Sequence, residues 1–140
     1  MRTTLITSGI VCTLLLSSCS RSFEPIDYGK DACAHCRMTI IDDRYAAELI
    51  TDKGKTYKFD DIICMKQYNS VDNQKDALYF VEDYLKKEAG AIDATTAFYL
   101  QHSFFKSPMN GNYAAFATQE DAAALADSLQ VQMFKWEGIK

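Results

Sequence analysis

Four side chains that bind metals or carry sulfur lie close together near the start of the chain, in the segment "CAHCRM". Cys33 and Cys36 are three residues apart, so a tight turn can direct both thiols at one ion, and Met38 follows on the same side of an extended segment. Thiolates and thioethers are soft ligands, and a thioether suits copper(I) better than zinc. Copper(I) also accepts two or three ligands, whereas structural zinc is held by four. The motif therefore favours copper(I).

A C-x-x-C pair alone is common to several kinds of site. Covalent haem attachment needs His directly after the second cysteine, and Arg37 stands there instead, which excludes it. Thioredoxin-like redox chemistry places its cysteines at the start of a helix, but the β-branched residues after Met38 favour a strand. Zinc stays an alternative, because Cys64 together with His35 or His102 could complete a set of four ligands.

A second candidate ligand lies far along the chain. Met109 stands in "SPMNGN", where proline, asparagine and glycine favour a turn, so its side chain either packs under the loop or is presented as a ligand. His102 is interpreted as a strand residue and His35 as either exposed or a ligand, and both are kept as secondary metal candidates. Cys64, followed by Met65, is interpreted as core filler, since free cysteine is common in protein cores.

The first residues are typical of an exported protein. Residues 1–18 carry one basic side chain, Arg2, then an apolar run and small residues, which together predict a signal peptide. The run is shorter than the roughly 20 apolar residues of a membrane-spanning helix. The sequence from Leu16 to Cys19 has the form of a lipobox, so Cys19 is predicted to carry acyl chains that anchor the protein to a membrane. A plain secretory signal followed by a chance cysteine is the alternative.

Composition narrows the class of protein. The chain of 140 residues is 48% hydrophobic and 24% charged, which suits one small globular domain or two very small ones. Loss of residues 1–18 removes one basic and no acidic side chain, so the formal charge changes from -4 to about -5, and no basic patch for nucleic acid is evident. With Cys12 removed and Cys19 lipidated, three cysteines are left, and an odd, closely spaced set in an exported protein indicates metal or redox chemistry.

The elements that must position these residues are predicted as a tether and two similar units. Residues 19–30 are polar, contain Pro25 and Gly29, and are predicted to be a lipidated tether. Residues 31–86 are predicted to form a ββαβ unit. In it, a hairpin turns at "DKGK", a helix begins at "DDIICMKQYNS", and "ALYFVEDYL" forms the last strand.

Residues 87–140 are predicted to repeat that order. The strands "TTAFYLQHSFF" and "YAAFAT" flank the "SPMNGN" turn, the helix "QEDAAALADSL" is capped by Thr118 with Asp121, and "VQMFKW" closes the unit. The predicted class is α+β, with the two small units packed face to face and a ligand cleft at their seam. The aromatic residues expected to be shared across the seam are Tyr57, Phe59, Phe80, Phe98 and Phe116.

The lipobox, the tether, "CAHCRMTI", "IDATTAFYL" and "SPMNGNYAAFATQEDAAALA" together resemble the NosL family, the nitrous oxide reductase accessory lipoproteins. The resemblance covers nearly the whole mature chain. It implies a copper(I) chaperone, not an enzyme, tethered to a membrane, facing the periplasm and built from two ββαβ units related to treble-clef folds. It also implies delivery of copper through a membrane transporter complex for assembly of the copper-sulfide centre of nitrous oxide reductase.

The resemblance extends to individual residues. Cys36 and Met38 fall on the cysteine and methionine of the family motif, Met109 falls on the methionine of its later turn, and Cys33 matches its first cysteine. The turn reads Met-Asn-Gly where Met-Gly is more usual in the family, a departure that bears on the direction of Met109. Two other hypotheses stay open: an exported lipoprotein that binds zinc or performs thiol redox chemistry, and an interaction module with incidental cysteines.

Overall fold

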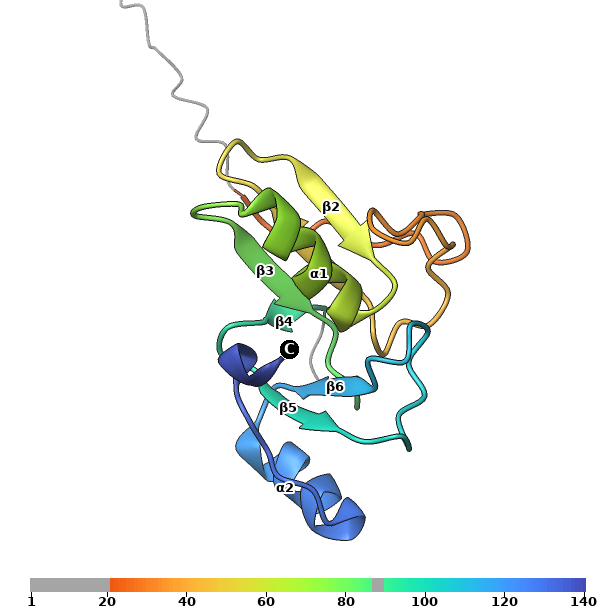
Figure 1. Ribbon diagram of the computed structural model, residues 1–140, viewed down its shortest axis with the longest axis vertical. Helices are drawn as coiled ribbons and strands as arrows, with labels where there is room; N and C mark the ends of the chain where they lie inside the picture. Colours follow the sequence, from red (N-terminus) through yellow and green to blue (C-terminus); the bar gives the residue numbers. More distant parts are fainter. Residues whose placement is uncertain (1–20, 87–89) are drawn as a thin grey trace, which may run out of the picture.

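Two antiparallel sheets and two helices make up the part of the chain that the computed structural model describes, residues 21–86 and 90–140 (Figure 1). The predicted signal peptide and Cys19 lie outside these described residues. The mixed α/β class predicted from the sequence is confirmed. Within residues 21–86 and 90–140, no helix has the length and apolar character needed to cross a bilayer.

The first sheet has the order β2-β1-β3-β4 and contains the predicted hairpin. Strands β1 (Ala47–Ile50) and β2 (Thr56–Phe59) are joined by a turn in which Gly54 adopts a φ of 80°, a conformation that glycine accepts without strain. Strand β3 (Leu78–Val81) pairs with the other edge of β1, and the short β4 (Ile92–Asp93) pairs with β3. The central strand β1 is buried along its whole length.

Helix α1 (Ile62–Asp72) follows β2 directly and lies across the first sheet (Figure 1). It begins where predicted, because Asp61 accepts a hydrogen bond from the backbone N–H of Ile63 at 3.1 Å and so satisfies a free donor of the first turn. The first four residues of the helix are buried, including Cys64. The first turn of α1 is therefore part of the core.

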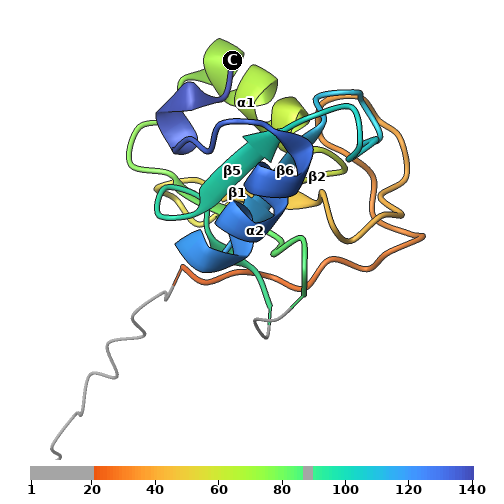
Figure 2. The same cartoon turned by 90° about the horizontal axis from the view of Figure 1, so that it is seen from below.

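The second sheet is the hairpin of β5 (Phe98–Gln101) and β6 (Tyr113–Phe116), followed by helix α2 (Gln119–Leu129). Because side chains alternate across a strand, the hairpin has two apolar faces. Tyr99 and Tyr113 pack into the core formed by the first sheet and α1, whereas the opposite face packs against α2. Figures 1 and 2 show the hairpin between the first sheet and α2.

The predicted aromatic residues are divided between two clusters instead of being shared at one seam. Phe59 belongs to the cluster beneath α1, with Tyr57 packed against it, and Phe116 belongs to the α2 cluster, with Phe98 packed against it. Phe80 belongs to neither cluster, because its side of the sheet faces the N-terminal segment. Its ring centroid lies 5.9 Å from that of Phe23 in that segment. The alternation of side chains along β5 and β6 explains the division, since each strand contributes side chains to both clusters.

The closing strand predicted at residues 131–136 is not formed. Only Phe134 pairs, through a single antiparallel bridge to Tyr99, and the chain then makes a short 3₁₀ turn, η1 (Trp136–Gly138). The rings of Phe134 and Trp136 pack on Tyr99, with centroids 6.2 Å away in each case. Side-chain packing therefore replaces backbone pairing in this segment, and the division into units at residues 31–86 and 87–140 stays a prediction.

Residues 21–30, predicted as part of a flexible tether, lie along the first sheet. The backbone N–H of Glu24 donates to the Glu48 carboxylate at 2.9 Å, and Arg21 donates to the backbone carbonyl of Asp76 at 2.8 Å. Ile26 is buried in the first core cluster. The polar composition that suggested a tether instead serves hydrogen bonds to the sheet, so the described part of this segment belongs to the folded body.

Candidate metal centre

The C-x-x-C motif forms a tight turn that is closed by backbone hydrogen bonds. The N–H of Cys33 donates to the carbonyl of Met38 at 2.8 Å, and the N–H of Arg37 donates to the carbonyl of Cys33 at 3.0 Å. Arg37 adopts a φ of 70°, which reverses the chain after Cys36. The strand expected after Met38 is reduced to a single bridge at Thr39. The cysteines therefore lie in a turn and not at a helix start, which argues, as the sequence did, against a thioredoxin-like site.

The turn is fixed to the first sheet beside the start of α1. The backbone N–H of Ala34, between the two cysteines, donates to the carbonyl of Lys58 on β2 at 2.8 Å. The ammonium group of Lys58 also forms a salt bridge of 2.8 Å with Asp31, just before the motif. Strand β2 leads into α1 within three residues, so the same strand positions both the turn and the first turn of the helix.

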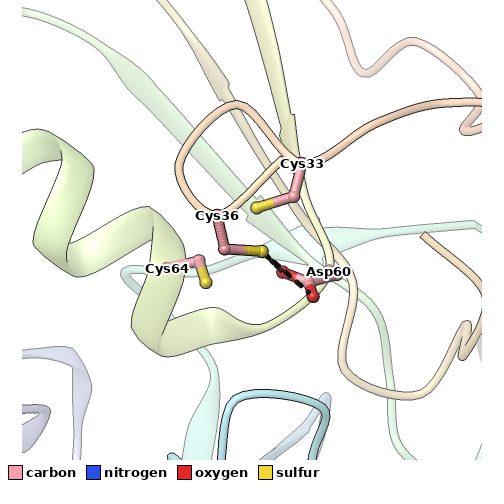
Figure 3. A group of neighbouring side chains, drawn as sticks. All are labelled: Cys33, Cys36, Asp60 and Cys64. Atoms are coloured by element: carbon pink, nitrogen blue, oxygen red, sulfur yellow. Dashed lines mark hydrogen bonds between the residues drawn. The ribbon is translucent and has the colours of Figure 1, made fainter. Parts of the chain in front are cut away.

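Four side chains converge where the C-x-x-C turn meets the start of α1. The sulfur atoms of Cys33, Cys36 and Cys64 and a carboxylate oxygen of Asp60 all lie within 4.8 Å of one another. Figure 3 shows the four side chains gathered where the turn meets the start of α1, with the Cys36 sulfur directed toward Asp60. The Cys36 thiol lies 3.4 Å from both carboxylate oxygens of Asp60. We call these four residues the thiol cluster.

Access to the thiol cluster is through one of its members. Cys33, Asp60 and Cys64 are buried, whereas Cys36 is only partly buried. All three cysteines are free thiols. An ion that arrives from solvent would therefore meet Cys36 first.

The thiols of the cluster differ in their readiness to ionise. A hydrogen bond from the Cys64 thiol is the largest of the effects that lower the pKa of Cys33. Donating that hydrogen bond raises the pKa of Cys64, and burial raises it further. Burial raises the pKa of Cys36 to about 11. One thiolate, at Cys33, is therefore favoured before any metal binds, and a metal that binds Cys36 must displace its proton.

The donor set is compatible with two metals. Three thiols and one carboxylate provide the four ligands that structural zinc requires. Two or three of the same thiols would hold copper(I), which prefers soft sulfur. The chemistry of the cluster is therefore that of a soft or borderline metal ion.

Both methionines of the predicted copper site lie at the surface. Met38 follows the C-x-x-C turn and is 50% exposed, and Met109 is 39% exposed. Met109 borders a pocket of about 320 Å³ between its own loop and α1, with Ile63 and Gln67 on the helix side. Its backbone N–H donates to the Asp61 carboxylate at 2.9 Å, which ties the loop to the residue next to Asp60. Neither methionine side chain is buried in a core.

The two histidines lie apart from the thiol cluster. His35 is exposed on the C-x-x-C turn. His102 follows the end of β5, outside the strand in which it was predicted, and its Nδ1 accepts a hydrogen bond of 3.1 Å from the N–H of Phe104. The zinc alternative expected a histidine as the fourth ligand. Among the described residues, the fourth member of the thiol cluster is Asp60 instead.

Sequence reasoning missed Asp60, and it named Cys64 only as core filler or as a ligand in the zinc alternative. Cys64 is buried, as predicted, but its sulfur faces the two cysteines of the turn and is more than core filler. From the sequence, Asp60 and Asp61 were interpreted only as residues that favour a helix start, and in the structure Asp61 is the cap. One signal in the sequence was the position of a third cysteine in the first turn of a helix that directly follows the hairpin. Only the packing of the turn on β2 shows that these residues meet.

Comparison with known proteins adds a family and a related structure. Residues 26–140 match a protein-family model described as NosL. The structure is similar to the crystal structure of the copper chaperone NosL from Shewanella denitrificans, with a TM-score of 0.69 and 18% sequence identity. The similarity covers 86% of this chain and 97% of that one. A comparison with curated proteins gave no match.

Proposed function

The chain belongs to the NosL family, and on this premise we propose that it is a membrane-anchored copper(I) carrier and not an enzyme. The observation that carries the proposal is the convergence of three free thiols within 4.8 Å, at a place that solvent reaches through Cys36. Soft sulfur ligands at a partly exposed site suit an ion that must be both bound and released.

In the proposed site, Cys36 and Cys33 bind copper(I) as thiolates, and Met38 and Met109 add thioether ligands from the exposed side. Two observations support this assignment. Cys36 is the member of the thiol cluster nearest solvent, and both methionines are exposed although they are apolar. Cys64 then supports Cys33 through its hydrogen bond and is not itself a ligand.

The thioethers give the proposed carrier a way to release its cargo. A thioether binds without losing a proton, so it can leave the ion during transfer without taking up a proton, whereas an incoming thiol from a partner would release its own proton on binding. Replacement would begin at the exposed methionines and end at Cys36. The proposed receiver is the maturation transporter complex that supplies copper for the copper-sulfide centre of nitrous oxide reductase, with Cys19 as the lipidated anchor. This client is proposed from the family resemblance.

Zinc is a second candidate metal for the thiol cluster, because one observation favours it. Cys33, Cys36, Cys64 and Asp60 are four donors within 4.8 Å, which is the number that a closed zinc site needs. The two proposals differ in their ligands, since zinc would use Cys64 and Asp60, whereas copper(I) would use the methionines.

Competition titrations test the proposed function directly. The full-length protein would be titrated with copper(I) against a chromophoric copper(I) chelator, and with zinc against a zinc chelator, under anaerobic conditions. We expect one copper(I) ion per chain, and a loss of affinity of about tenfold or more in Met109→Leu. Met133→Leu is the matched control, because Met133 packs against the α2 cluster, away from the thiol cluster. Zinc that binds more tightly than copper(I), or equal copper affinity in the two leucine variants, would contradict the proposal.

The client and the anchor need tests in the host. In a strain that carries Cys36→Ser, nitrous oxide reductase should be folded but deficient in copper, and added copper should partly correct the defect. Cys19→Ala should release the protein from the membrane without changing its copper affinity. A reductase with its full copper content under copper limitation would exclude this client, and a membrane-bound Cys19→Ala variant would exclude the lipid anchor.

A further inference from the structure

The start of α1 holds two adjacent aspartates that face different parts of the molecule. Asp60 contacts the Cys36 thiol at 3.4 Å, whereas the carboxylate of Asp61 contacts the loop that carries Met109. We propose that Asp61 is a positioning residue, which fixes the Met109 backbone at the start of α1, next along the chain to Asp60 of the thiol cluster, before copper(I) arrives. The proposal rests on the proposed function in one respect, the use of Met109 as a ligand.

The contacts of Asp61 join the two halves of the chain. One carboxylate oxygen accepts the N–H of Ile63 at 3.1 Å and caps α1. The other oxygen accepts the Ser107 hydroxyl at 2.6 Å and the Met109 N–H at 2.9 Å. Asp61 is fully buried and Ser107 is 3% exposed, so these bonds have little competition from water.

The loop around Met109 is also bonded within itself. The N–H of Asn112 donates to the Ser107 hydroxyl at 2.7 Å, and the N–H of Ser107 donates to the Asn112 side chain at 3.1 Å. The N–H of Asn110 donates to the Ser107 carbonyl at 3.0 Å. Because Ser107 takes part in all three bonds, the Asp61 contact with Ser107 fixes the position of the whole turn. We call residues 107–112 the methionine loop.

The methionine loop approaches α1 more closely than a side chain would allow. A Cβ atom on Gly111 would lie 2.8 Å from the Cβ of Ile63 and 3.1 Å from a carboxylate oxygen of Asp61. Asn110 and Asn112 adopt φ values of 57° and 53°, the left-handed region that asparagine tolerates better than most residues. The Met-Asn-Gly turn therefore serves to seat the loop on the start of α1.

The arrangement links the proposed methionine ligand to the thiol cluster through one dipeptide. A movement of the methionine loop away from Asp61 would leave a buried carboxylate oxygen without both of its donors, the Ser107 hydroxyl and the Met109 N–H, which is costly. The ligand is therefore held in place in the metal-free protein, and less ordering is needed when copper(I) binds.

Asp61→Asn separates the two tasks of this carboxylate. Asparagine caps helices as well as aspartate, so the bond to Ile63 is kept. Its amide group, however, would present a donor to the Met109 N–H, which is also a donor. Thr118→Ala is the matched control, because it removes the cap of α2 and touches no part of the methionine loop.

The first readout is a double-mutant cycle on copper(I) affinity in the full-length protein. We expect Asp61→Asn to lower the affinity about tenfold in the parent, and less than about twofold when it is added to Met109→Leu. Thr118→Ala should leave the affinity unchanged. Equal losses in the parent and in Met109→Leu would overturn the proposal, because Asp61 would then act on the thiol cluster or on the fold as a whole.

The second readout needs no copper. Amide hydrogen exchange in the metal-free protein should be at least about tenfold faster at Met109 in Asp61→Asn, with little change at Ile63. Unchanged exchange at Met109 would overturn the proposal even where copper affinity falls. If the parent protein binds no copper(I), the proposed function fails, and exchange alone then decides whether Asp61 holds the methionine loop.

Discussion

The two helices begin in the same way, but their caps make different contacts. Each contains 11 residues, each follows a strand that ends in phenylalanine, and each has its cap two residues after that phenylalanine, Asp61 for α1 and Thr118 for α2. The Thr118 hydroxyl bonds to Asp121, three residues away. The Asp61 carboxylate reaches Ser107, which is 46 residues away.

Their first turns differ in burial as well. The first four residues of α1 are all buried, whereas the buried residues of α2 are Ala122 and Ala126, on a single stripe. Cys64 lies in that buried first turn of α1. Of the two helix starts, the one at α1 therefore provides members of the thiol cluster, and the residues at the helix start, not the order of the elements, determine where the candidate metal site lies.

The largest expected effect concerns the two caps. Asp61→Ala should lower the free energy of unfolding by about 3 kcal/mol, because it removes the α1 cap and leaves Ser107 and the Met109 N–H without their acceptor. Thr118→Ala should cost about 1 kcal/mol, since only a local cap is lost. Urea unfolding of both variants measures the difference. Equal losses would mean that the long-range contacts of Asp61 add no stability.

The second prediction concerns function at the α1 side. Cys36→Ser should lower copper(I) affinity at least about 100-fold, equivalent to roughly 2.7 kcal/mol, because a hydroxyl is a poor ligand for a soft ion. Thr118→Ala, at the start of the other helix, should leave copper affinity within about twofold of the parent, because the hydroxyl that it removes bonds to Asp121 in the same helix. Chelator competition measures both. A strong effect of Thr118→Ala would break the comparison between the helices.

Local sequence signals predict the elements well. The helix of residues 119–129 has the predicted bounds, and Thr118 caps it as its hydroxyl suggested. The turn at Gly54 and the start of α1 after two aspartates are also as predicted. These features depend on residues within one turn of each other, so the sequence alone determines them.

Long-range contacts account for what the sequence did not predict. The β-forming character of "VQMFKW" predicts a closing strand, but its rings pack on Tyr99 and Tyr79 instead of extending a sheet. Cys64 and Asp60 lie where expected along the chain, yet their meeting with Cys33 depends on how the C-x-x-C turn docks on β2. The polar segment 21–30 similarly gave no sign of the sheet groups to which it bonds.

The third prediction concerns the pH dependence of stability, which depends on what covers each sheet. The outer face of β5 and β6 is covered by the apolar side of α2, whereas Glu48 on β1 is buried next to the N-terminal segment. Burial raises the pKa of Glu48 from 4.5 to about 7, and one of its carboxylate oxygens has no hydrogen-bond partner among the described residues. The folded state therefore binds a proton there that the unfolded state releases between these two pH values.

The sign of this effect follows from the raised pKa. The contribution of Glu48 to stability is fully present below pH 4.5 and is lost as the pH rises through about 7, where the buried carboxylate ionises. Relative to the parent, Glu48→Gln should therefore gain about 2 kcal/mol of stability between pH 4.5 and pH 8. Urea unfolding at both pH values provides the measurement. A stability difference between the two proteins that does not change with pH would show that Glu48 is not protonated in the folded state.

The smallest expected effect on copper sharpens the assignment of the site. Cys64→Ser keeps a hydroxyl that can donate to Cys33, so copper(I) bound by Cys33, Cys36 and the methionines should lose less than about threefold in affinity. Zinc held by all four members of the thiol cluster would lose one of its ligands, and its affinity should fall by about 100-fold. Parallel chelator competitions with the two metals measure this ratio. A large loss of copper affinity would instead make Cys64 a copper ligand, and the start of α1 would then bind the ion itself and not merely support the residues that do.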